Sequence, residues 1–413
     1  MPQGNVVRQP FVATIPGVWI VISALLAMTG AASFLAAISL GEDLRAWQAY
    51  LVNFVFWTGL AFGAVLFSAV LNMTGAKWGR PLKRLAEGFA AYLPVAVLLF
   101  WVLYFGREQL FHWVRHPVVE KQVWLNTGFM FARNSAGLIL LTILSSALAY
   151  FSVKGDKLWA QSTGNGTLAP SDVESQTPSW RSQRTLSPAI AIAYAFVLSL
   201  LAFDLIMSLD PHWYSTLFGG YYFIGSFYCG IVVLYLLALA SMDSRSFGAY
   251  ISPRQLHDLG KLVFAFSLFT GYLFYTQFLV IWYGNLPEET KYVILRVKLS
   301  PWEPLAWLSL FMIFLIPFVV LLSRRIKLRR VPMILLSVMI LAGMWLERFI
   351  LVVPSVWKQG NIPIGLLEVL ITAGFVGLVA LCLTLFLRRV PIVPISDPLF
   401  RQLIAEKEER LEP

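Results

Sequence analysis

The chain has 413 residues, of which 58% are hydrophobic and 13% are charged. Soluble domains are about 45–50% apolar and about 25% charged, so this composition excludes an ordinary soluble protein. A net charge of +10 would favour nucleic acid as the partner of a soluble protein. Here membrane topology and anionic lipid account for the charge, and we expect no binding of nucleic acid.

Long apolar segments follow one another along the chain, each near the ~20 residues that cross ~30 Å of hydrocarbon as a helix. We predict an all-α polytopic membrane protein, one integral membrane domain over 1–413, with about ten transmembrane helices. The first segment exceeds a signal-peptide core of roughly 7–15 residues, which favours an uncleaved span. The segments are 16–40, 51–72, 88–105, 127–151, 187–209, 219–242, 258–283, 302–322, 332–353 and 364–387.

Two polar regions interrupt or follow the apolar segments. Residues 152–186 are rich in Ser, Thr, Gly and Pro, which predicts a flexible loop, and residues 388–413 form a polar tail. Of the 32 Lys and Arg, 21 lie in the tails and connections on the side of the termini and eight on the other side. The positive-inside rule therefore places both termini, the loop and the tail in the cytoplasm.

The sequence offers no pattern typical of a resident redox cofactor. His112, His116, His212 and His257 all lie at span ends or in connections, so they predict no haem pair inside the membrane. His112 and His116 have helical spacing, which suits either a metal or a hydrated pair at the interface; we favour the hydrated pair. The two cysteines lie apart, unlike the clustered ligands of iron–sulfur centres. We expect no cofactor and no metal in this chain.

An internal repeat would relate the second and sixth spans. Both contain an aromatic–glycine pattern, FWTGLAFG at 56–63 and YFIGSFYCG at 222–230. An offset of four spans preserves orientation, so the repeat would relate parallel four-helix units. Small residues also recur at helix interfaces of any polytopic protein, and the sequence leaves both interpretations open.

Charged residues within the apolar spans need partners, because each costs at least ~2.5 kcal/mol in the membrane. The topology places the charges within the spans at one depth in the outer third of the bilayer, and it places Asp210 and His212 at the outer surface. We therefore expect one buried polar cluster, which serves either as a static ion-pair network or as an outer half-channel for protons or a site beside a quinol. Its candidate members are Arg133, Asp204, Asp210, His212, Glu347, Arg348 and Glu368.

Four stretches carry a resemblance to a known family. They are LYFGREQLFHW at 103–113, FDLIMSLDPHWYSTLFGGYYFIGSF at 203–227, QFLVIWYGNLPEET at 277–290 and ERFILVVPS at 347–355. Together they resemble the NrfD or polysulfide-reductase membrane subunits, and specifically the branch called ActF of bacterial alternative complex III. Glu347 and Gly284 depart from the pattern, where Asp and Ala are expected.

The resemblance implies a fold and an assembly. Its members have two four-helix bundles, spans 2–5 and 6–9, flanked by spans 1 and 10. The assembly oxidises quinol, such as menaquinol, and feeds electrons to cytochrome c or directly to a terminal oxidase. The partners would be a second NrfD-like membrane subunit that oxidises quinol, a periplasmic iron–sulfur subunit, and multihaem and monohaem cytochrome c subunits, which carry haem c and the iron–sulfur clusters. The ActF branch is proposed to conduct protons or couple conformations.

Three functions compete. The first is a cofactor-free subunit that supports proton conduction, energy coupling and assembly beside the quinol-oxidising subunit. The second is quinol binding and oxidation by this chain itself, with Asp204, His212 and Tyr222 at the quinone site. The third is a secondary transporter, although transporters bind their substrates near the midplane, deeper than these charges.

Overall fold

The computed structural model describes residues 12, 15–164, 178–244 and 247–409. In this part of the chain ten helical spans are long and apolar enough to cross a membrane, which confirms the predicted all-α polytopic fold. The described residues contain no β-strand, and a single isolated bridge joins Val12 and Pro391. The protein is therefore a multi-pass membrane protein.

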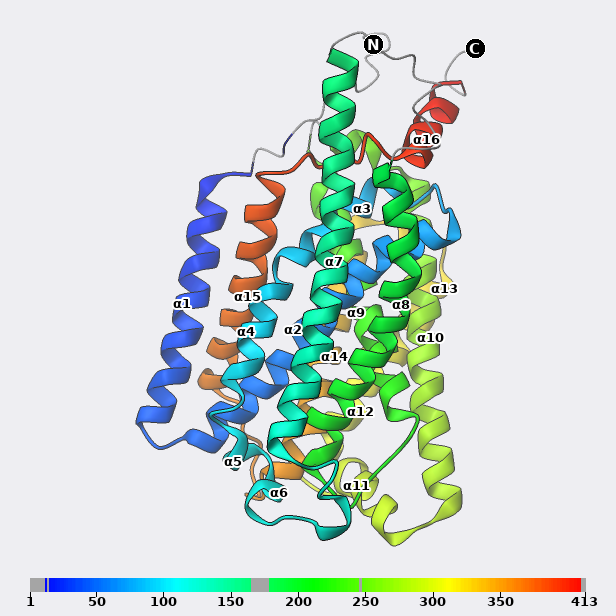
Figure 1. Ribbon diagram of the computed structural model, residues 1–413. Coiled ribbons are helices and arrows are strands. Elements are labelled where there is room, and N and C mark those ends of the chain that lie inside the picture. Colours follow the sequence, from blue (N-terminus) through cyan, green and yellow to red (C-terminus); the bar gives the residue numbers. More distant parts are fainter. Residues whose placement is uncertain (1–11, 13–14, 165–177, 245–246, 410–413) are drawn as a thin grey trace.

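The ten spans run roughly parallel in one bundle (Figure 1). Eight spans are single helices: α1 (Gly17–Ser39), α2 (Asp43–Thr74), α7 (Thr127–Gly164), α8 (Pro178–Leu205), α9 (Phe218–Ser241), α10 (Pro253–Gly284), α14 (Arg330–Val356) and α15 (Leu366–Leu387). The third span, Arg80–Val102, contains α3 (Lys83–Gly88) and α4 (Leu93–Val102). The eighth span, Glu303–Leu322, contains α12 (Glu303–Leu310), a π-helical turn at Phe311–Leu315 and α13 (Ile316–Leu322). Shorter helices α5 (Arg107–Leu110), α6 (His112–Arg115) and α11 (Pro287–Val297) lie at one end, and α16 (Pro398–Glu409) lies at the other.

The spans form two four-helix bundles with two flanking helices, as the resemblance implied. In the first bundle α2 contacts α4 and α8, and α7 contacts α4 and α8. In the second, α9 contacts α10 and α14, α10 contacts α13, and α14 contacts α12. The flanking helices α1 and α15 pack against each other at one side of the molecule (Figure 1). The centre of the protein is the contact between α2 and α9, one helix from each bundle.

The glycines of the two similar patterns meet at this central contact. A Cβ atom built on Gly63 would lie 2.3 Å from the carbonyl oxygen of Ser226, and one on Gly230 would lie 2.4 Å from the backbone nitrogen of Ala64. The backbones of α2 and α9 can approach this closely only because both positions lack a side chain. The repeated pattern thus has a packing role, whatever its origin.

Replacing Gly230 with alanine is therefore expected to lower the free energy of unfolding by about 1–3 kcal/mol, because the new methyl group meets backbone that cannot rotate away. Gly220→Ala in the same helix is the control. A Cβ there meets nothing within 4 Å, so we expect a gain of up to about 1 kcal/mol from helix propensity. Unfolding in mild detergent measures both, and equal effects of the two changes would contradict the close contact.

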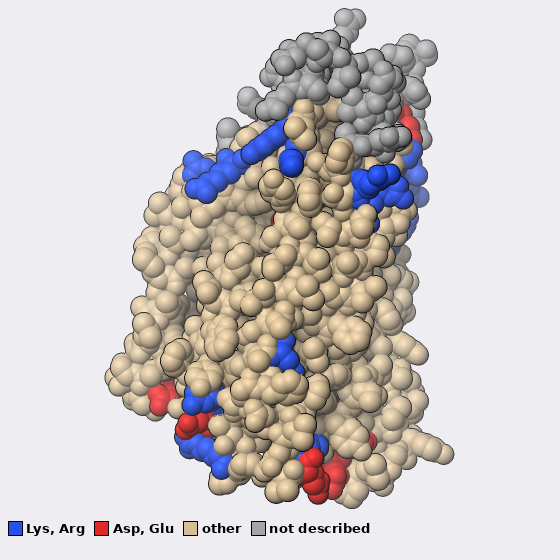
Figure 2. Space-filling model, viewed as in Figure 1, with Lys and Arg blue, Asp and Glu red and all other residues tan. Residues whose placement is uncertain are grey.

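Charged side chains gather at the two ends of the molecule, and the belt between them is mostly uncharged (Figure 2). We call the end where α1 begins and α15 ends the basic end, and the other the opposite end. The third span begins at Arg80, eight residues before the predicted start at residue 88. Arg80, Lys83 and Arg84, which the sequence suggested were loop residues, are therefore helical, and all three are 0% exposed.

The predicted loop 152–186 is largely helical. Helix α7 continues to Gly164 and α8 begins at Pro178, while residues 165–177 lie outside the described part of the chain. Polar residues can extend a helix beyond the membrane, so composition alone placed the loop boundaries too wide.

The predicted tail 388–413 packs against the basic end for much of its length. Residues 391–395 are buried, and α16 follows them. Apolar side chains such as Val393 and Ile395 are buried in the hydrophobic core, which explains why this segment is not solvated.

Candidate functional site

The first buried ion pair at the opposite end joins α7 to α8. The carboxylate of Asp204 is 0% exposed and accepts from Arg133 Nε at 2.7 Å and Arg133 Nη2 at 2.5 Å. Asn134 Nδ2 donates to the same carboxylate at 2.6 Å, and Trp124 Nε1 donates at 3.0 Å. The Arg133 guanidinium also covers the Trp124 ring at 3.9 Å. Four donors therefore hold the carboxylate of Asp204 in place.

The second pair lies on α14 and faces α9. Arg348 Nη1 donates to Glu347 Oε2 at 2.7 Å, and Arg348 Nη2 donates to the backbone oxygen of Tyr222 at 3.4 Å. The guanidinium lies 4.5 Å from the centre of the Tyr222 ring. The Tyr222 hydroxyl donates to the backbone oxygen of Val55 on α2 at 2.7 Å. This pair is thus fixed to both central helices.

The third pair joins α2 to α15. Arg45 Nε donates to Glu368 Oε1 at 2.6 Å, and Arg45 Nη2 donates to Glu368 Oε2 at 2.8 Å. The backbone nitrogen of Gly365 also donates to Glu368, which caps the start of α15. Arg45, which the sequence placed in an outer connection, lies in the first turn of α2 and is the partner that Glu368 needed.

The charged residues form three separate pairs and not the one connected cluster that we expected. Among the described residues, no ion pair or hydrogen bond joins one of these pairs to another. Arg133 and Asp204 do meet, and so do Glu347 and Arg348. Each carboxylate finds a cation on its own or a neighbouring helix, so the three pairs satisfy their charges separately.

Asp210 and His212 lie beyond the ion pairs, at the opposite end. His212 is exposed, whereas Asp210 is half-buried beside a shallow cavity of about 350 Å³ that α11 lines. The ring of Trp213 stacks on the ring of Tyr292 of α11 with 3.7 Å between their centres, and the Arg296 guanidinium lies 3.4 Å from the centre of the Tyr292 ring. Burial raises the pKa of Tyr292 to about 12, so its hydroxyl stays neutral at physiological pH. The stack fixes the connection after α8 on α11.

A buried charge network at the basic end escaped the sequence analysis. Arg84 bridges two acids, with Nη1 donating to Glu87 Oε2 at 2.8 Å and Nη2 donating to Asp156 of α7. Ser68 of α2 donates to Glu87 at 3.0 Å, and Ser396 of the tail donates to Asp156 at 2.7 Å. All three charged side chains of this triad are 0% exposed.

The rest of the network holds the tail. Asp397 Oδ2 accepts from Arg80 Nη1 and from Lys83 Nζ, each at 2.9 Å. Arg80 also donates to Asn72 of α2 at 2.7 Å, and Lys83 donates to Gln183 of α8 at 2.7 Å. Three cations and three acids thus balance, which makes burial tolerable. The helical spacing of Lys83 and Arg84 with Glu87 was a signal that could have revealed part of it.

The pKa of Asp397 supports a prediction for acid stability. Burial acts to raise this pKa, but Lys83 and Arg80 outweigh it and lower the pKa below the ordinary value of 3.8. A depressed pKa stabilises the fold fully above the ordinary value, and this contribution is lost as the pH falls through the folded-state pKa. Asp397→Asn should cost about 3 kcal/mol at pH 7.

The difference in unfolding free energy between the wild type and Asp397→Asn should stay constant from pH 7 to about pH 5 and shrink below the ordinary Asp pKa of 3.8. Unfolding in detergent over this pH range measures it. A difference that grows on acidification would contradict the pairing.

Buried polar side chains occur along α2 between the two charged ends. Arg45 belongs to the opposite-end pair, whereas Ser68 and Asn72 bind the basic-end network. Asn53, between them, donates to Thr372 at 3.0 Å and accepts from Trp345 at 3.1 Å. The polar residues of this row are all at most 3% exposed: Gln48, Asn53, Thr58, Ser68 and Asn72.

The histidines, cysteines and acids form no metal-ligand set in the part of the chain that the structure describes, where no group of three His, Cys, Asp or Glu converges. His112 and His116 lie 4.7 Å apart between ring centres and are both exposed, which agrees with a hydrated pair. Cys229 is buried in α9 and Cys382 is half-buried in α15.

Comparison with known proteins adds the family. No curated protein matches the chain in sequence. The family model described as polysulphide reductase, NrfD, matches residues 18–358, which include nine of the ten spans. Members of this family are membrane subunits, generally of quinone-interacting redox complexes, and typically partner with iron–sulfur subunits. The chain therefore belongs to the NrfD family of polysulphide-reductase membrane subunits.

Proposed function

We propose that this protein is the ActF-type, cofactor-free membrane subunit of a quinol-oxidising respiratory complex, alternative complex III, and that it supports proton conduction and energy coupling. The proposal rests on one observation above all, the buried polar row on α2 that runs between the ion pairs at one end and the charge network at the other. Paired charges at both ends with hydroxyl and amide side chains between them are the elements of a proton relay.

The Lys and Arg excess supports an orientation in which the basic end faces the cytoplasm of a bacterial inner membrane. The three ion pairs would then lie near the periplasmic surface, where iron–sulfur and haem c subunits would dock. In this arrangement electrons travel on the partners, and the quinol is oxidised in the second NrfD-like subunit. This chain would contribute the proton path and a membrane platform.

Quinol oxidation by this chain itself has less support. Its proposed site needs Asp204, His212 and Tyr222 together, yet four donors hold Asp204. His212 is exposed at the end of the molecule, and the Tyr222 hydroxyl already donates to Val55. The transporter alternative also gains little, because the ion pairs lie toward one end rather than at the midplane.

Purification of the tagged protein in mild detergent tests the proposal. We expect iron–sulfur and multihaem cytochrome c subunits to co-purify, together with a second NrfD-like subunit and a haem absorption spectrum. A colourless, solitary and stable polypeptide would contradict the proposal and favour a transporter.

A further inference from the structure

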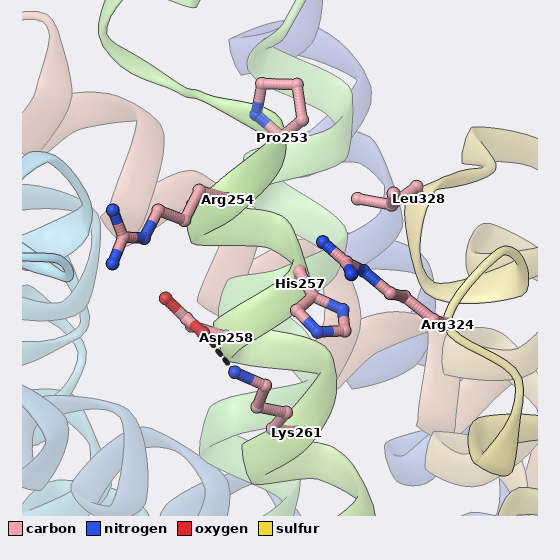
Figure 3. Close-up of a pocket in the computed structure, with 7 residues that line it drawn as sticks. All are labelled: Pro253, Arg254, His257, Asp258, Lys261, Arg324 and Leu328. Atoms are coloured by element: carbon pink, nitrogen blue, oxygen red, sulfur yellow. Dashed lines mark hydrogen bonds and ion pairs between the residues drawn. The ribbon is translucent and has the colours of Figure 1, made fainter.

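A hollow lined by cations lies at the basic end, between the first turns of α10 and the connection after α13 (Figure 3). Its volume is about 470 Å³. The lining residues that bear on its chemistry are Arg254, His257, Asp258, Lys261, Arg324 and Leu328. Figure 3 shows the guanidinium of Arg324 beside the ring of His257, so groups from both segments face the same space.

The positive charge of this hollow exceeds what its own acid can neutralise. Asp258 is the one acid of the lining, and it is paired with Lys261 at 2.8 Å. Arg254 and Arg324 have no ion pair or hydrogen bond with any described residue. Lys327 lies close to this group of positive charges, because the nearby Lys261, together with burial, lowers the pKa of Lys327. Two of the three lining Lys and Arg are therefore free to bind an anion.

The surface below the hollow is apolar. Leu322 and Val319, in the last turns of α13 before Arg324, are 62% and 65% exposed. They belong to the eighth span, which is long and apolar enough to cross a membrane, so acyl chains can cover them. A basic pocket between membrane helices with an apolar wall beneath it has the chemistry that anionic lipid head groups bind.

We propose that this hollow binds the phosphate of an anionic phospholipid, with Arg324 on the phosphate, Arg254 adding positive charge from the other side of α10 (Figure 3), and the acyl chains along α13. Free inorganic phosphate shares the charged part of this chemistry but cannot use Leu322 and Val319. The lipid would hold the start of α10 against the connection after α13, and this role does not depend on the proposed respiratory function.

The test is a titration of the full-length protein, with any subunits that co-purify, in mild detergent with fluorescent phosphatidylglycerol and, separately, phosphatidylcholine. We expect phosphatidylglycerol to bind more tightly, and Arg254→Gln with Arg324→Gln to weaken it about tenfold, given two lost cations. The control is Arg388→Gln with Arg389→Gln, which removes the same charge from exposed residues at the same end. It should weaken binding less than about twofold.

Two results would overturn the proposal. If the pocket and control variants weaken phosphatidylglycerol equally, the attraction is a general effect of surface charge. If inorganic phosphate at millimolar concentration displaces the lipid completely, the hollow is a site for free phosphate. The substituted side chains lie at the surface, so an unchanged melting temperature of both variants establishes that folding is intact.

Discussion

Replacing Arg84 with methionine is expected to lower the free energy of unfolding by about 3–5 kcal/mol. Arg84 is the shared cation of Glu87 and Asp156, and all three side chains are 0% exposed. Methionine fills a similar volume but leaves Asp156 without its counter-charge and Glu87 with Lys83 alone, at 4.0 Å. The energetic cost lies in these under-compensated acids rather than in the lost attraction, because burial desolvates each of them. Unfolding in mild detergent measures the loss.

Two further variants separate this cause from others. Lys77→Met removes an ion pair with Glu406 whose side chains are 40% and 47% exposed, and it should cost no more than about 1 kcal/mol. The double change Arg84→Met and Asp156→Asn removes one charge of each sign and leaves Glu87 with Lys83 at 4.0 Å, so it should recover most of the loss. If the double variant is less stable than Arg84→Met, uncompensated charge is not the cause.

The apolar segments alone could predict the number and order of the spans, because each must bury its backbone polar groups within one helix. The search for apolar segments placed the start of the third span eight residues too late, at residue 88 instead of Arg80. A search for apolar residues excludes Arg80, Lys83 and Arg84, yet these residues are helical and buried because Asp397, Glu87 and Asp156 neutralise them. Partners as distant in sequence as residues 80 and 397 leave no local pattern.

The candidate site was predictable in part. Depth in the membrane could place Arg133, Asp204 and Glu368 in one layer, but depth does not reveal which side chains meet. Glu347 and Arg348 pair as neighbours in sequence, whereas Arg133 and Asp204 meet only because α7 packs on α8. The apolar segment predicts a span that starts at residue 51, which leaves Arg45 in a connection. Helix α2 begins eight residues earlier, at Asp43, and therefore includes Arg45.

Replacing Arg133 with methionine is expected to cost about 3–5 kcal/mol of unfolding free energy. Asp204 would keep the donors Asn134 and Trp124 but would lose its counter-charge at 0% exposure. Adding Asp204→Asn removes the second charge at almost constant shape, so the double variant should recover most of the stability. Asp243→Asn is the control, since its pair with Arg330 is exposed and should contribute no more than about 1 kcal/mol.

The same double variant distinguishes a static pair from a proton-conducting one. A static ion pair has only a structural effect, so a complex that regains its stability should also regain proton translocation per quinol oxidised. A conducting role needs a carboxylate at position 204, and asparagine cannot carry a proton there. We therefore expect the stable double variant to oxidise quinol at the wild-type rate while translocating fewer protons. Wild-type translocation in that variant would contradict a conducting role for Asp204, because Arg133 and Asp204 would then serve only to join α7 to α8.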